Sequence, residues 1–302
     1  MKIRYEGWAA FVEDFYAPDA TDEEIQIIGN LLSDCTVVTI RGQQKMTALD
    51  DHVFSGRFGR HDLFDEVKRK YRGFYDSIMT SYPEAPSIAR VTGAKNDEGM
   101  PGLHGHDGDL DWHCNKPHMK NRVSIAYLRS IHGSVGSRTS WINSKLAYDD
   151  LSDEWKERIK DVKLLTMSSF YNYSKIYDEF KLDDAYAADM GYFPSMVETN
   201  PRGNKTIHFP FLQMKGLDNV KDAEEEREIM DYIKAHMMQE KYMFHLDWQD
   251  GDINLADQWS GIHKRWAFAG MEGRLLHRIG HDYDNIKFVD NYLDGVEVIR
   301  ES

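Results

Sequence analysis

The chain has 302 residues, of which 41% are hydrophobic and 12% aromatic, so it can bury a sizeable core and is not a disordered chain. Its formal charge of −14 repels phosphate backbones, and no basic patch interrupts the sequence, so we expect no nucleic-acid partner. No apolar stretch approaches the roughly 20 residues of a membrane-spanning helix, and the two cysteines indicate no disulfide framework. These properties favour a cytoplasmic globular protein without a membrane partner.

Helix and strand signals alternate in the first hundred residues. Thr21 and Glu24 form a capping-box pattern ahead of a run of isoleucines and leucines, which predicts a helix start, and Gly59 is the expected end of a second helix. In chain order we expect a helix over 21–32, a strand over 34–43, a helix over 46–59, a helical stretch over 60–80, and loop with short strand over 83–101.

The rest of the chain predicts mostly short strands. In chain order we expect strands over 123–130 and 139–143, a helix over 152–162, a strand over 164–173, a surface insertion over 174–195, a hairpin over 195–209, a helix over 222–240, and strands within 242–257 and 274–282. No internal repeat or linker divides the chain, so we expect one domain over 1–302. Short strands between turns predict a mainly β fold, an antiparallel core decorated by α-helices. The insertion is the kind of segment that often sets substrate specificity.

The clearest chemical signal is a histidine at a strand end, His113, followed two residues later by Asn115. Because side chains alternate along a strand, both point to one face and could reach the same metal ion, while Cys114 points away. A second histidine, His263, comes from a different strand. Two histidines and a carboxylate form the facial triad that leaves positions open on iron(II) for oxygen chemistry. Here the third residue is an amide.

Two arginines, Arg274 and Arg278, lie four residues apart on another predicted strand and share one face. An arginine offers two parallel N–H donors, which match the carboxylate of a 2-oxo acid that also chelates iron. Each of these residues alone is typical of an ordinary strand end or a surface ion pair. Only their combination indicates a site.

Four segments, in this order, make the chain resemble the TauD/TfdA superfamily of Fe(II)- and 2-oxoglutarate-dependent oxygenases over most of its length. The segments are VVTIRGQQKMTALDDHVFSGRFG, DWHCN at the place of the family's Trp-His-x-Asp, GSRTSWINSKLAYDDLSDEWKERI, and WQDGDINLADQWSGIH, which is similar to the run that ends in the family's second histidine. The spacing from His263 to Arg274, and on to Arg278, also matches the family pattern.

The resemblance implies a double-stranded β-helix, a cupin-like jelly-roll, and an enzyme that uses Fe(II), O₂ and 2-oxoglutarate to hydroxylate a small molecule. The 2-oxoglutarate is decarboxylated to succinate in the same reaction. Carried over position by position, the resemblance assigns metal ligation to His113, Asn115 and His263, 2-oxoglutarate binding to Thr139 and Arg274, and substrate binding to Arg278 and Asp109. The last two favour a charged substrate. Relatives often assemble as dimers or tetramers, so a homo-oligomer is also expected.

The chain departs from the family pattern in three places: Asn115 stands in place of the ligating aspartate, Gln258 replaces an asparagine, and the family's substrate residues after Phe-Gly are not matched by RHDLFDEV, which follows Gly59. The amide oxygen of Asn115 can still bind a hard cation, more weakly than a carboxylate would, and oxygenation would then continue. Alternatively, the missing carboxylate leaves room for a halide, as in halogenase relatives, although these carry Gly or Ala there. The chain could also be a non-catalytic protein that binds 2-oxoglutarate, iron or zinc, or Asp111 could supply the carboxylate.

Four other histidines lie close to these motifs in the chain. His277 lies between the two arginines and is expected to face away from them. His104, His106 and His118 could form a separate divalent-metal cluster, although the glycine-rich segment PGLHGHDGD is more often only a loop.

Overall fold

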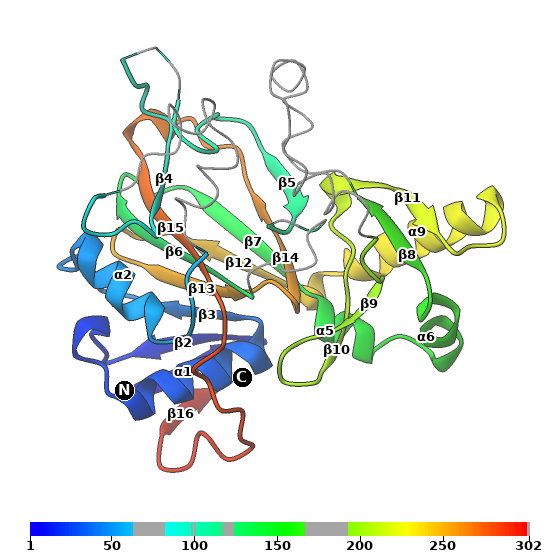
Figure 1. The fold of residues 1–302 in the computed structure, drawn as a ribbon, viewed down its shortest axis with the longest axis horizontal. Helices are drawn as coiled ribbons and strands as arrows, with labels where there is room; N and C mark the ends of the chain where they lie inside the picture. Colours follow the sequence, from blue (N-terminus) through cyan, green and yellow to red (C-terminus); the bar gives the residue numbers. More distant parts are fainter. Residues whose placement is uncertain are drawn as a thin grey trace.

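The computed structural model describes residues 1–62, 82–97, 99, 101–115, 117, 124–166 and 193–300. Their strands form an eight-stranded sheet and a four-stranded sheet that pack face to face, with helices against the outer surfaces (Figure 1). The mainly β architecture with helical decoration is therefore confirmed. Among these residues no helix is both long enough and apolar enough to cross a membrane.

The larger sheet contains strands from both ends of the chain. In spatial order they are β16 (Glu297–Arg300), β1 (Lys2–Glu6), β2 (Ala9–Glu13), β3 (Val37–Ile40), β13 (Ile253–Asp257), β6 (Ile125–His132), β15 (Leu275–His281) and β4 (Ala89–Thr92). The sequence analysis missed β1 and β2, which form a hairpin around Gly7, a residue with a φ of +60°. The alternation of buried Ile3 and Tyr5 with more exposed neighbours was the available signal.

The smaller sheet carries most of the candidate metal residues. Its strands, in spatial order, are β12 (Met243–Asp247), β7 (Arg138–Asn143), β14 (Gly261–Arg265) and β5 (Leu110–His113). Two short ribbons lie beside it. They pair β9 (Val197–Thr199) with β10 (Lys205–Ile207), which is the hairpin expected over 195–209, and β8 (Lys163–Thr166) with β11 (Met214–Asp218).

The first helix begins where the sequence predicts, since Thr21 and Glu24 form the expected capping box, whereas the short helix over Ser144–Asp149 was not predicted. The second helix, however, ends at Gly56, and the prediction that Gly59 ends it is wrong. A Cβ on Gly59 would lie 2.3 Å from the carbonyl oxygen of Asp282, so glycine there permits a close approach of two chain segments. The helices are α1 (Asp22–Cys35), α2 (Ala48–Gly56), α5 (Ser144–Asp149), α6 (Asp153–Ile159) and α9 (Ala223–Met237), with 3₁₀ turns at η1 (Ala17–Asp19), η3 (Phe211–Gln213), η4 (Glu240–Tyr242) and η5 (Met271–Gly273).

Three expectations fall partly outside the described residues. They are the helical stretch over 60–80, the strand over 164–173 beyond Thr166, and the insertion over 174–195.

Three apolar clusters fill the layers of the molecule. One lies between the larger sheet and helices α1 and α2, and includes Leu31, Val38 and Leu255. A second lies outside the smaller sheet, against α5 and α9. The third lies between the two sheets, where Trp141 of β7 and Leu276 of β15 belong to one cluster. The gap that this third cluster leaves unfilled is the candidate site.

A buried charge network joins α2 to the outer face of the larger sheet. The carboxylate of Asp51, fully buried, accepts hydrogen bonds from Tyr127 at 2.5 Å and from Arg129 at 2.5 and 2.8 Å. His277 Nδ1 lies 2.5 Å from the same carboxylate, and its other ring nitrogen lies 2.9 Å from the hydroxyl of Tyr82. His277 thus faces away from the pocket, as the sequence predicts. The network fixes β6 and β15, two strands that line the pocket on their other face.

Replacing Asp51 with Ala leaves the buried Arg129 guanidinium without its carboxylate. We expect the free energy of unfolding to fall by about 3–5 kcal/mol, because an uncompensated buried charge is costly. The neighbouring Asp50→Ala change removes a half-buried carboxylate of the capping box and should cost about 1 kcal/mol. Urea denaturation of both variants tests this, and equal losses would show that the network contributes no more than a cap.

Candidate active site

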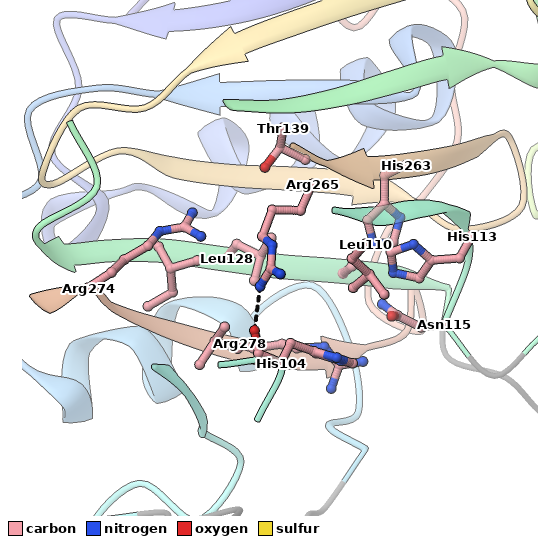
Figure 2. Close-up of a pocket in the computed structure, with 13 residues that line it drawn as sticks. His104, Leu110, His113, Asn115, Leu128, Thr139, His263, Arg265, Arg274 and Arg278 are labelled. Carbon is pink, nitrogen blue, oxygen red and sulfur yellow. Dashed lines mark hydrogen bonds between the residues drawn. The ribbon is translucent and has the colours of Figure 1, made fainter. Parts of the chain in front are cut away.

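A pocket of about 550 Å³, counted out to its opening, lies between the two sheets (Figure 2). Its lining residues are Val91, His104, Leu110, His113, Asn115, Ala126, Leu128, Thr139, His263, Arg265, Arg274, Leu276 and Arg278. Six of the seven site residues predicted from the sequence are among them. The exception is Asp109.

The pairing of β5 with β14 places His113 directly opposite His263. Their ring centroids lie 4.1 Å apart, and both rings extend into the pocket (Figure 2). His113 Nδ1 lies 2.7 Å from the backbone carbonyl oxygen of Asp111. Since a carbonyl only accepts, that nitrogen carries the proton and Nε2 keeps its lone pair. This is the tautomer that a metal-binding histidine needs.

His113 is buried and His263 is half-buried, and desolvation is the main cause of the low pKa values of both imidazoles. It lowers the pKa of His113 to about 4 and that of His263 well below its usual range. Neutral imidazole is the form that ligates a metal. Within the described part of the chain, His263 Nδ1 has no hydrogen-bond partner, so this ring nitrogen remains available for a further polar contact.

A β-bulge changes the expected orientation of Asp111. The register of β5 against β14 shifts by one residue between His113 and Leu110, so side chains do not alternate strictly along this strand. The Asp111 carboxylate is 52% exposed and lies 3.4 Å from Lys264 Nζ, between two pocket-facing residues of β14. The idea that Asp111 shares a face with His113 and supplies the missing carboxylate is therefore wrong.

Two buried glutamines hold the strand end that carries Asn115. Gln213 accepts from the N–H of Cys114 at 3.1 Å and donates to its carbonyl at 2.9 Å, while Gln258 accepts from the N–H of Asn115 at 3.0 Å. Cys114 is fully buried in the cluster outside the sheet, as the expected alternation requires, and Asn115 lines the pocket. The sequence analysis missed Gln213 because it lies about a hundred residues away in the chain.

The donors present fit a metal ion with one weak ligand. In the described ranges no three His, Cys, Asp or Glu side chains are placed to hold an ion together. The lining contains no carboxylate, so besides the two histidines the amide oxygen of Asn115 is the available donor on this strand end. An amide oxygen is an ordinary ligand for hard cations. His113, His263 and Asn115 could hold an ion together.

The other end of the pocket is built for an anion. Arg274 is 1% exposed, and its described polar contacts are Ser134 Oγ at 3.3 Å and Met271 Sδ at 3.7 Å. No acidic side chain in the described ranges pairs with it, and burial lowers its pKa to about 10. Thr139 lies beside it in the pocket and accepts from Trp248 Nε1 at 2.9 Å, which leaves the hydroxyl proton free to be donated. A carboxylate would satisfy both groups.

Arg265 is a pocket residue that the sequence analysis missed. Its guanidinium donates to the backbone carbonyls of His104, His106 and Gly108, the last two at 2.6 Å. It therefore holds the segment that brings the His104 side chain into the pocket, with His104 at a left-handed φ of 52°. His106 instead contacts Arg265, so these two histidines do not form the separate cluster considered above, and His118 lies outside the described residues.

Asp109 lies away from the pocket. Its carboxylate is 44% exposed, lies 3.1 Å from Lys264 Nζ and accepts from the N–H of Ala267 at 2.5 Å. These contacts lower its pKa, with the Lys264 hydrogen bond as the largest cause. The expected substrate contact gains no support from this position.

Comparison with known proteins identifies the family of this chain and solved structures with its fold. The family model described as Taurine catabolism dioxygenase TauD, TfdA family matches residues 8–279. Pentalenolactone F synthase from Streptomyces arenae is 20% identical over 281 residues, which cover 88% of this chain and 89% of that protein. The (S)-phenoxypropionate/alpha-ketoglutarate-dioxygenase from Sphingobium herbicidovorans is 26% identical over 188 residues, 60% of this chain and 64% of that protein.

Solved structures with the same fold include a taurine dioxygenase from Burkholderia xenovorans, with a TM-score of 0.67, 16% identity, and 93% of this chain and 88% of that chain covered. Another is AAD-2 in complex with Mn(II) and N-oxalylglycine, with a TM-score of 0.69, 16% identity, and 93% and 97% covered. At these identities the likeness concerns the fold.

Arg274 predicts that small dicarboxylates stabilise the protein. Succinate at one hundred times its dissociation constant should add about 2.7 kcal/mol to the free energy of unfolding, seen as a rise in Tm. The Arg274→Met variant should lose this response, because the guanidinium that the anion would neutralise is gone. Arg138→Met is the matched control, since Arg138 is 47% exposed and paired with Asp247. An equal rise in all three proteins would contradict an anion site at Arg274.

Proposed function

Because the chain belongs to the TauD, TfdA family, we propose that it is a non-haem Fe(II)- and 2-oxoglutarate-dependent oxygenase that acts on a small molecule. It would hydroxylate this substrate with O₂ while 2-oxoglutarate is decarboxylated to succinate. The observation that carries the proposal is the pairing, in one pocket, of two neutral imidazoles with a buried arginine that lacks an acidic partner among the described residues.

His113, His263 and Asn115 would hold the iron. The Nδ1–H of His113 is already engaged by the carbonyl of Asp111, so Nε2 is the atom that faces an ion. Asn115 would contribute its amide oxygen, which brings no charge. The metal would therefore keep one more positive charge than in a site with a ligating aspartate, and the anionic cosubstrate would be correspondingly important for holding it.

Arg274 and Thr139 would hold the carboxylate of 2-oxoglutarate that lies farther from the iron. The buried guanidinium of Arg274 would form an ion pair when the cosubstrate binds, and this favours a dianion over neutral ligands. The hydroxyl of Thr139 is fixed by Trp248 and so donates in one direction. These two residues would orient the cosubstrate relative to the histidine pair.

When bound, Fe(II) and 2-oxoglutarate supply the oxygen activation that oxidises a carbon–hydrogen bond. The protein would position the reacting groups and exclude water from them. Leu110, Leu128 and Leu276 line the pocket and would help to keep water from the reacting groups. The imidazoles stay neutral at physiological pH and leave their lone pairs for the metal.

Arg278 would contact the substrate. It lines the pocket close enough to His113 and His263 to lower their pKa values. We therefore propose a small substrate with an anionic group, and one relative is named for a substrate of this kind, phenoxypropionate. We propose further a single double-stranded β-helix domain over 1–302, in agreement with the two facing sheets, and a cytoplasmic location.

The first test is anaerobic. Metal-free protein mixed with Fe(II) and 2-oxoglutarate should develop the visible charge-transfer band of an iron–oxo-acid complex and, once exposed to O₂, should release succinate. His263→Ala should abolish the band. His245→Ala should keep it, because His245 contacts Ser140 and Glu240 on a strand outside the pocket. Absence of the band in the wild-type chain, with iron not retained, would favour the non-catalytic binding protein.

The second test concerns Asn115. Asn115→Asp restores a charged ligand, so Fe(II) affinity should rise by about tenfold or more, and succinate formation should be kept or increased. Asn115→Gly removes the ligand and should weaken iron binding. If Asn115→Asp were inactive while Asn115→Gly turned over only with chloride present, the proposal of an oxygenase would give way to a halogenase.

A further inference from the structure

Two of the positions that depart from the family pattern, Asn115 and Gln258, are in direct contact. The side-chain oxygen of Gln258 accepts a hydrogen bond from the backbone N–H of Asn115 at 3.0 Å. These residues lie far apart in the chain, and neither one alone gives a reason to connect it with the other. The contact therefore links the two departures structurally.

Gln258 is firmly anchored. Gln258 is 1% exposed, and its backbone N–H donates to the backbone carbonyl of Ser124 at 2.8 Å. The preceding residue, Asp257, holds the turn that follows, because its carboxylate accepts from the N–H of Trp259 and the hydroxyl of Ser260, both at 2.8 Å. This turn joins β13 to β14, the strand that carries His263. Gln258 therefore connects the segments that bring the two halves of the metal site together.

The strand end that Gln258 contacts has little freedom left. Gln213 occupies both backbone polar groups of Cys114, and the Cys114 side chain is fully buried on the far side of the sheet. Gln258 occupies the N–H of the next residue. With these groups fixed, the Asn115 side chain extends into the pocket beside His113 (Figure 2).

A neutral ligand depends on such fixing more than a carboxylate does. An aspartate is drawn to a cation by its charge, so it turns toward the ion even from a loosely held backbone. An amide oxygen has only a dipole, and an unrestrained asparagine would lose side-chain entropy on binding and could present its NH₂ group instead. Holding the backbone of Asn115 reduces this cost before the metal arrives.

We propose that Gln258 is a positioning residue that aims the amide oxygen of Asn115 at the metal, so that the two residues act as a pair. The inference rests on the proposed function, because it requires that the pocket hold a metal ion. Gln258 itself touches neither metal nor substrate. Its effect on the metal passes through Asn115, and this gives the proposal a specific test.

The experiment measures Co(II) binding to the metal-free full-length chain by its visible absorption, and Cu(II) binding by electron paramagnetic resonance. The variants are Asn115→Ala, Gln258→Leu and the double variant. Asn115→Ala and Gln258→Leu should each raise the Co(II) dissociation constant by about 10-fold and should change the Cu(II) spectrum in the same way. The double variant should be no weaker than Asn115→Ala, because no ligand remains for Gln258 to aim.

Two controls separate positioning from general stability. Gln43 is also 1% exposed, and its side chain hydrogen-bonds to backbone groups of Phe15, Ala17 and Arg41, but it does not contact Asn115. Gln43→Leu should lower the Tm without moving the Co(II) dissociation constant. Gln258→Glu keeps an oxygen that accepts from the same N–H, so it should retain the wild-type Co(II) spectrum that Gln258→Leu loses.

Three results would overturn the inference. If Gln258→Leu weakened Co(II) binding as much in the Asn115→Ala background as in the wild type, Gln258 would act through the strand as a whole. If Asn115→Ala left both spectra unchanged, or the Cu(II) spectrum counted three imidazoles, a residue such as His104 would be the third ligand, and the proposed oxygenase would stand without this pair. If the wild-type chain bound neither ion, the inference and the proposed function would fall together.

Discussion

The antiparallel pairing of β5 with β14 is the constraint on which the rest of the site depends. It brings two strands from distant parts of the chain together and sets His113 opposite His263 at 4.1 Å between ring centroids. The bulge in the same pairing turns Asp111 outward to Lys264. A register one residue different would reverse which side chains face the pocket, so the candidate metal site, the strand end at Asn115 and the segment held by Arg265 all follow from it.

Charge explains what such a pocket can bind. The charged side chains that line it in the described ranges are arginines, and burial keeps the imidazoles neutral. Arg265 is satisfied by backbone carbonyls and serves the architecture, whereas Arg274 has no acidic partner among the described residues. An anion would therefore complete the pocket, and a metal held without a carboxylate ligand, as proposed, would strengthen that requirement. Both the neutral side chain at Asn115 and the lack of an acidic partner for Arg274 among the described residues favour the proposed anionic cosubstrate.

Asn115 shows why a single departure from a family pattern is difficult to interpret alone. In the sequence it is a lost carboxylate, compatible with an oxygenase, a halogenase or a binding protein. In the structure its backbone is held by Gln258, another departure, and its neighbour is held by Gln213. Two buried hydrogen bonds with Gln213 and a partly buried one to Gln258 therefore satisfy the backbone polar groups of this strand end, as buried backbone requires in an ordered segment.

The sequence by itself determined the features that are local or carried by motifs. The capping box of Thr21 and Glu24 and the hairpin over 195–209 could be predicted because a few adjacent residues encode each one. The mainly β class and the family could be predicted because short local signals recur in a fixed order along the chain. The tertiary structure alone decided the orientation of Asp111, the close approach at Gly59, the Asp51 network and the contacts of Gln213, Gln258 and Arg265. Each of these depends on a distance between residues far apart in the chain, and that distance exists only once the sheets have paired and packed.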